Sequence, residues 1–106
     1  MNDPMVQLLS LSRRAGKLLR GFDQVKEGIA QQQVCAVVLA QDLSPKTEKE
    51  LRYVCRNLTV PFVAVPATMA QLEQYVGKKV GVMALTEAGF AQKLQALAQD
   101  SPQTRP

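Results

Sequence analysis

Val34-Cys35-Ala36-Val37-Val38-Leu39-Ala40 is the longest uninterrupted apolar run in the chain. Because every position is apolar, the run suits a strand that is covered on both faces rather than a strand with one side in water. The run is also too short to cross a bilayer as a helix. We therefore expect a buried central strand, with helices on both sides of the sheet to which it belongs.

Two helices and a short strand are predicted before this run. Asp3-Pro4 is a helix-start signal, because Asp accepts hydrogen bonds from free N–H groups and Pro at the first helical position loses none. Gly16 is placed to end that helix in a left-handed cap. A strand over residues 17–20 and an amphipathic helix over residues 22–32 should follow. The apolar stripe expected for the first helix comprises Met5, Leu8, Leu9 and Leu11.

Helices and strands continue to alternate after the run. Ser44-Pro45 starts a helix, residues 62–65 read as a strand, and Thr68 caps a helix that Gly77 ends. A strand over residues 80–85 and a helix starting at Thr86 complete the pattern. The buried stripe expected for the helix after Ser44 comprises Leu51, Val54, Cys55 and Leu58.

This alternation predicts an α/β fold: a three-layer α/β/α sandwich with a central four-stranded mixed sheet. The length of 106 residues and the hydrophobic content of 46% suit one core and one domain. We expect that domain to span residues 1–99 and residues 100–106 to form a flexible polar tail. The N-terminus lacks a basic segment followed by an apolar stretch and cleavage site, so we expect an unexported, cytoplasmic protein.

The positive charge of the chain is unevenly distributed. Thirteen Lys and Arg residues against nine Asp and Glu residues give a net charge of +4. Residues 13–20 hold four cations and no acid, and Lys78 and Lys79 lie in a second acid-free stretch. Such clusters attract polyanions, although charge alone fits an ordinary solvated face as well.

The residues needed for common catalytic chemistry are missing. The chain contains no His, which excludes Ser-His-Asp and Cys-His nucleophile systems and histidine metal sites. The segment from Gly16 to Gly21 looks like a phosphate loop, but Phe22-Asp23 stands where Lys-Ser/Thr is required. Cys35 and Cys55 fit buried, reduced thiols rather than a zinc site. We expect no catalytic residues, no metal and no cofactor; an enzyme would need a pocket of convergent polar groups that spacing does not reveal.

Several short motifs, in order and at matching spacing, resemble the kink-turn-binding ribosomal protein family, the large-subunit proteins seven-Ae and thirty-e. They are Gly21-Phe-Asp-Gln-Val-Lys-Glu-Gly-Ile29, Val37-Val-Leu-Ala-Gln-Asp42, Val60-Pro61 and residues 72–77. Leu11-Ser-Arg-Arg-Ala-Gly-Lys-Leu18 and Thr86-Glu-Ala-Gly-Phe-Ala-Gln-Lys-Leu94 look most like the short bacterial YlxQ-type branch. The resemblance spans residues 8–97, and the family's α/β/α sandwich agrees with the predicted pattern.

The resemblance implies recognition of a sharply bent RNA duplex by the N-terminus of the second helix. A helix N-terminus favours phosphate, and Gly21 would let the backbone approach RNA closely. Gln24 would bond a purine edge, while Lys17 and Arg20 would meet phosphates. The loop before the last strand would pack against unstacked bases. The RNA-binding residues expected on this basis are Lys17, Arg20, Gly21, Phe22, Asp23, Gln24, Lys26, Glu27, Gln41, Asp42, Val76, Gly77, Lys78, Lys79 and Val80.

Two of these positions depart from the family's pattern. Asp23 stands where most members carry Asn or Lys, and Glu27 stands where they carry Lys. Both changes add negative charge, which guanine O6 and phosphate oxygens repel. They motivate an alternative: a divergent member that has lost kink-turn binding and acts as a protein-interaction module or binds a different RNA. The partners expected are structured RNA, including ribosomal RNA, and the ribosome or its proteins, with no membrane and with the chain as a monomer.

Overall fold

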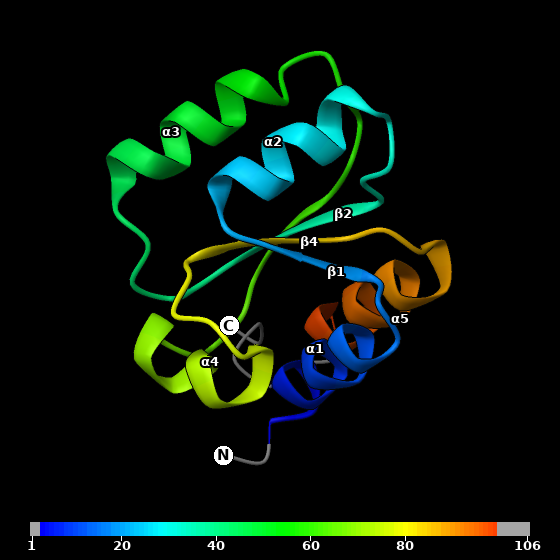
Figure 1. The fold of residues 1–106 in the computed structure, drawn as a ribbon, viewed down its shortest axis with the longest axis vertical. Helices are drawn as coiled ribbons and strands as arrows, with labels where there is room; N and C mark the ends of the chain where they lie inside the picture. The colour runs from blue at the N-terminus through cyan, green and yellow to red at the C-terminus, as the bar shows by residue number, and fades with distance from the viewer. Residues whose placement is uncertain (1–2, 100–106) are drawn as a thin grey trace.

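The computed structural model describes residues 3–99, which are arranged in three layers (Figure 1). Four strands form the middle layer; α2 and α3 cover one face of the sheet, and α1, α4 and α5 cover the other. The α/β/α sandwich predicted from the sequence is confirmed. The elements in chain order are α1 (Pro4–Arg14), β1 (Leu18–Arg20), α2 (Phe22–Ala30), β2 (Ala36–Leu39), α3 (Pro45–Val54), β3 (Phe62–Ala64), α4 (Met69–Val76), β4 (Val82–Leu85) and α5 (Ala88–Gln99).

The sheet is mixed, as predicted, with the strand order β1-β4-β2-β3. β4 runs antiparallel to both of its neighbours, so that Ala84 pairs with Leu19 on one side and with Val37 on the other. β2 and β3 are parallel, with Val38 opposite Val63. The last strand in the sequence therefore lies inside the sheet, between two strands that precede it in the chain.

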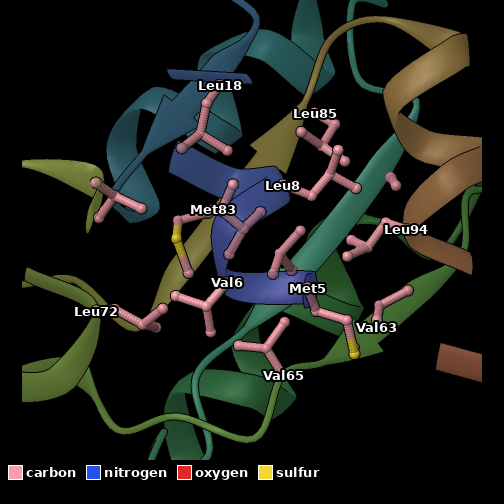
Figure 2. Packing of buried hydrophobic residues seen from close by; sticks show 14 of the residues in the cluster. Met5, Val6, Leu8, Leu18, Val63, Val65, Leu72, Met83, Leu85 and Leu94 are labelled. Carbon is pink, nitrogen blue, oxygen red and sulfur yellow. The ribbon is translucent and has the colours of Figure 1, made fainter. Parts of the chain in front are cut away.

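The two sides of the sheet face separate apolar clusters. Because successive side chains of a strand point to opposite faces, Val38 packs toward α1 and α4, whereas Val37 and Leu39 pack toward α2 and α3. Figure 2 shows the larger cluster, in which side chains of α1, α4 and α5 meet those of the strands. This double coverage explains why the central run is apolar at every position, and why all four residues of β2 are buried.

Three helices begin where their cap residues predict. The Asp3 carboxylate accepts hydrogen bonds from the backbone N–H groups of Met5 at 2.8 Å and Val6 at 3.3 Å. Ser44 caps α3 through the N–H group of Thr47 at 3.2 Å. Thr68 caps α4 in a reciprocal capping box with Gln71.

Two residues assigned to buried stripes lie on the surface instead. Leu11 is 49% exposed, whereas Ser12, one helical step of about 100° further round, is fully buried and donates its hydroxyl to the carbonyl of Leu9 at 2.8 Å. Leu58 is 37% exposed because α3 ends at Val54, so helical spacing no longer applies to it. These two predictions were wrong, because burial follows the face that a helix turns to the sheet rather than the hydropathy of single residues.

Smaller differences concern element ends and one thiol. β2 and β4 are shorter than the apolar runs that contain them. Cys35 is half-buried just before β2, where a buried strand position was expected, while Cys55 is buried as predicted. The tail expected over residues 100–106 lies outside the described residues.

Candidate nucleic-acid interface

Three elements reach the same end of the sheet. The last residue of β1, Arg20, is paired with Met83 of β4, and the last residue of β2, Leu39, is paired with Val82. The backbone N–H group of Gly21 donates to the carbonyl of Val82 at 2.8 Å. Figure 1 shows the start of α2 and the α4–β4 connection at this end. The sheet therefore brings together the N-terminus of α2 and the loop before β4, although Arg20 and Val76, at the edges of these segments, are 56 positions apart in the chain.

The close approach of these two segments is centred on Gly21. Its φ of 98° is a conformation that other residues rarely adopt. A Cβ atom at this position would lie 3.7 Å from Val80 Cγ1 and 3.9 Å from Lys78 Nζ. The two segments that the resemblance assigns to RNA binding thus lie side by side. We call residues 20–24 and 76–80 together the α2/loop surface.

The first turn of α2 presents unsatisfied backbone donors. Its N-cap residue is Gly21, which has no side chain to accept a hydrogen bond, and no other side chain among residues 3–99 caps this helix. The first N–H groups of a helix have no partner inside the helix, so here they are open to a bound acceptor. Gln24 Oε1 accepts the backbone N–H of Arg20 at 2.9 Å, which turns the amide oxygen inward and leaves the amide nitrogen as a donor for a ligand.

Two guanidinium groups lie at the start of the loop. Arg20 Nη1 donates to the carbonyl of Val76 at 2.8 Å, at the C-terminus of α4. Gly77 ends that helix in the left-handed conformation with φ 79°, and a Cβ atom on it would lie 2.7 Å from Arg13 Cζ. Both cations also lie at the C-terminus of α4, where they interact favourably with the negative end of its helix dipole. The start of the loop carrying Lys78 is therefore hydrogen-bonded to Arg20 of β1 and lies against Arg13 of α1.

Arg13 was not among the binding residues predicted from the sequence. It belongs to the basic stretch over residues 13–20, but nothing in that stretch indicates which of its cations reaches the loop. The packing of α1 on α4 decides this, because it brings the Arg13 guanidinium against Gly77. The contact of Arg13 with the loop could have been predicted only from knowing which helices pack together.

Several predicted site residues lie away from the α2/loop surface or are occupied by structural contacts. Lys17 lies beyond the opposite end of β1, where its carbonyl accepts the N–H of Thr86 at 3.0 Å. Asp42 Oδ1 accepts the N–H of Met69 at 2.9 Å and so supports the start of α4. The backbone N–H of the adjacent Gln41 donates to Ala67 at 2.8 Å.

The remaining predicted residues lie on α2. Phe22 is half-buried at its first position, while Asp23 is exposed in the first turn. Lys26 lies one turn further on and faces α3. Glu27 Oε2 accepts a hydrogen bond from Gln31 Nε2 at 3.3 Å, which draws its charge toward the C-terminal half of the helix. Of the two acidic departures, Asp23 is thus the one that belongs to the α2/loop surface.

The cations of the α2/loop surface are not neutralised by carboxylates. Within residues 3–99 the ion pair that the structure shows joins Arg52 to Glu48, at 3.0 Å on α3. Lys78 and Lys79 are exposed, and Arg20 is half-buried. An unpaired positive surface beside open N–H donors is suited to a polyanion.

The described part of the chain offers little for other kinds of site. No group of three or more His, Cys, Asp or Glu residues within residues 3–99 could hold a metal ion. None of the helices in the same range has the length and apolar character needed to cross a membrane. Burial raises the pKa of the Cys55 thiol above its ordinary value, and the nearby charge of Arg52 offsets this only in part.

Comparisons with known proteins agree on one family. The chain matches the Ribosomal protein L7Ae/L30e/S12e/Gadd45 family over residues 3–95. It is 36% identical over 91 residues to the RNA-binding protein YlxQ of Bacillus subtilis (strain 168), which covers 85% of this chain and 90% of that protein. The RNA-binding protein YlxQ of Enterococcus faecium is 29% identical over 92 residues, covering 87% and 88% of the two chains.

Solved structures show the same fold. A protein of unknown function from Bacillus halodurans matches with a TM-score of 0.84 and 32% identity. The match covers 93% of this chain and 100% of that chain. The Giardia lamblia 15.5kD RNA binding protein matches with a TM-score of 0.68 and 18% identity, covering 92% of each chain. At that identity the second likeness concerns the fold alone.

Proposed function

We propose that this chain, which belongs to the Ribosomal protein L7Ae/L30e/S12e/Gadd45 family, binds structured RNA through its α2/loop surface. Two of its relatives are named RNA-binding proteins, and their similarity extends over most of both chains. Neither the family nor these names indicate an enzyme. Ribosomal RNA and the ribosome are the first partners to test, given the family.

One observation carries this proposal: the uncapped N-terminus of α2 lies directly against the Lys78 loop. The open N–H groups and the positive helix end favour phosphate oxygens, and the cations of the loop add to that attraction. Gly21 lies close to Val80 and Lys78 of the loop, and the Gln24 amide nitrogen is left to donate to a base edge. Backbone contacts and base contacts are thereby offered side by side.

We further propose a preference for bent RNA of the kink-turn type. The α2/loop surface consists of two segments that lie side by side, so it offers contacts to two neighbouring parts of a folded RNA. Unpaired purines at a bend expose edges that a continuous A-form helix keeps in its deep, narrow major groove.

A second candidate is favoured by Asp23. Its carboxylate lies exposed in the first turn of α2, where it competes with an RNA phosphate for the same N–H groups. A divergent domain with this residue would bind a different RNA or a protein in place of a kink-turn. The two candidates differ in one measurable property, the ratio of affinities for bent and straight RNA.

The experiment is a titration of a fluorescent kink-turn RNA against a straight duplex of equal length at two salt concentrations. Lys78→Ala should weaken binding to every RNA and reduce the slope of log affinity against log salt by about 1. Lys93→Ala, which removes an exposed cation on α5 outside the α2/loop surface, is the matched control and should leave both unchanged. Equal binding of bent and straight RNA would reject the kink-turn preference, and no binding of either would reject the binding of structured RNA through the α2/loop surface.

A further inference from the structure

A second surface lies between α2 and α3, next to the α2/loop surface. The two helices run side by side over one face of the sheet (Figure 1). Between them the structure shows an open groove of about 740 Å³. We call it the α2–α3 groove. Its lining residues are Phe22, Lys26, Lys49, Glu50, Tyr53, Val54 and Arg56.

The most exposed large apolar side chain among the described residues lies in this groove. Tyr53 is 65% exposed, although its ring is already stacked with Arg56, whose Cζ lies 4.0 Å from the ring centroid. Arg56 Nη1 also donates to the carbonyl of Tyr53 at 2.9 Å, so the stack is anchored to the helix end. A flat, fixed platform with its outer side open to solvent results.

Arg52, the arginine within α3, is engaged differently. Arg52 is paired with Glu48 at 3.0 Å and lies over the Phe62 ring at 4.4 Å. Its charge and its planar surface are therefore both used within the protein. Only the platform formed by Tyr53 and Arg56 is presented to the groove.

The groove carries an excess of positive charge. Lys26, Lys49 and Arg56 line it together with one carboxylate, Glu50. The other acids of the two helices are Asp23, in the first turn of α2, Glu27, which is hydrogen-bonded along α2, and Glu48, which is paired with Arg52. An aromatic platform flanked by cations is the combination that binds single-stranded nucleic acid, through base stacking and phosphate contacts.

The groove is continuous with the α2/loop surface. Phe22, the first residue of α2, belongs to that surface and lines the groove as well. We propose that the α2–α3 groove binds an unpaired strand that leaves the RNA held at the α2/loop surface, with one base stacked on Tyr53 and phosphates beside Lys26 and Lys49. This inference rests on the proposed function, because it places the strand on the RNA bound there.

The test compares kink-turn RNAs that are blunt or carry a short uridine overhang at the 5′ or the 3′ end. On the wild-type chain, one overhang should tighten binding about tenfold, as expected for a base stacked on an aromatic ring. Tyr53→Ala should abolish that gain while leaving the affinity for blunt RNA unchanged. Since Tyr53 is mostly exposed, the substitution leaves the apolar clusters intact, which circular dichroism and thermal unfolding will verify.

The chain offers a charge-matched control on the same helix. Lys49 lines the groove, whereas Lys46 is exposed on α3 outside it. Lys49→Ala should reduce the overhang gain, and Lys46→Ala should preserve it. Equal effects of the two substitutions would show a diffuse attraction and overturn the specific groove.

The two proposals fail in different ways. If neither overhang tightens binding, or if the gain persists in Tyr53→Ala, the groove proposal is overturned while binding of blunt kink-turn RNA still stands. If bent and straight blunt RNAs bind equally, the kink-turn preference fails, and the overhang gain is then measured on the straight duplex. If no duplex binds, titration with oligouridine decides: binding that depends on Tyr53 supports the groove, and its absence overturns it.

Discussion

The guanidinium of Arg20 donates a hydrogen bond of 2.8 Å to the carbonyl of Val76, joining residues that are 56 positions apart in the chain. The bond connects the end of β1, directly before α2, with the end of α4, directly before the loop at Lys78. It therefore fixes the relative position of the two halves of the α2/loop surface. The same cation stabilises the C-terminus of α4 through the helix dipole.

Arg20→Ala should lower both stability and RNA affinity. Loss of a partly buried hydrogen bond from a charged donor costs about 1–2 kcal/mol of the free energy of unfolding, which urea denaturation measures. Lys78 would then be less well placed, so affinity should fall by more than the loss of one phosphate contact explains. Arg14→Ala, which removes an exposed cation of α1, is the control. An unfolding free energy unchanged in Arg20→Ala would refute the role given to this bond.

Gly77→Ala should destabilise the domain more than Gly16→Ala. Both glycines have a positive φ, of 79° and 74°, so both substitutions carry a backbone cost of about 1 kcal/mol. A Cβ at Gly77 would also displace the Arg13 guanidinium, the far end of a flexible side chain, which adds a small cost, whereas one at Gly16 has nothing within 4 Å. The difference between the two variants should shrink in an Arg13→Ala background. Thermal or chemical unfolding of this set forms a double-mutant cycle, and a constant difference would mean that Arg13 does not rest on Gly77.

Asp23→Asn should tighten RNA binding more than Glu27→Lys does, per unit of charge changed. Asp23 lies in the first turn of α2, while Glu27 is drawn toward Gln31 and away from the α2/loop surface. The helix itself should lose about 0.5 kcal/mol in Asp23→Asn, because an acid in the first turn is favourable to the dipole. Affinities at equal salt provide the comparison. If Glu27→Lys has the larger effect per charge, RNA contacts extend further along α2 than we propose.

The two thiols should react at different rates. Cys35 is half-buried, whereas Cys55 is buried and its pKa is raised by that burial. A raised pKa means less thiolate at a given pH, and the thiolate is the reactive form, so Cys55 should remain unlabelled by iodoacetamide at neutral pH while Cys35 reacts. Labelling of Cys55 should increase only as the pH rises through its elevated pKa or as the chain unfolds. Mass spectrometry of peptides will identify the modified residue, with Cys35→Ser as the control; faster labelling of Cys55 than of Cys35 would contradict the structure.

The sandwich could be predicted because local signals and the hydrophobic pattern agree. Asp3, Ser44 and Thr68 cap helices as their sequence context indicates, and the central run became a strand covered on both faces. Leu11 and Leu58 were misassigned because hydropathy does not state where a helix ends or which side it turns inward.

The candidate site was predicted less completely, because it depends on contacts between distant segments. A resemblance of motifs pointed to Gly21 and to the loop at Lys78, and these two segments do lie together. It also pointed to Lys17, which lies at the far end of β1, and it left out Arg13. Asp42 was expected in the interface, yet its carboxylate supports α4. Residue type alone does not separate a ligand contact from a cap.

The position of β4 has a consequence for synthesis on the ribosome. β4 lies between β1 and β2 in the sheet. As long as β4 is still inside the ribosome, the nascent chain can therefore pair only β2 with β3. Gly21 lacks its backbone acceptor on Val82 until the same moment. The ability to capture a polyanion should therefore appear late and abruptly during translation, so that a prematurely terminated product lacks it altogether.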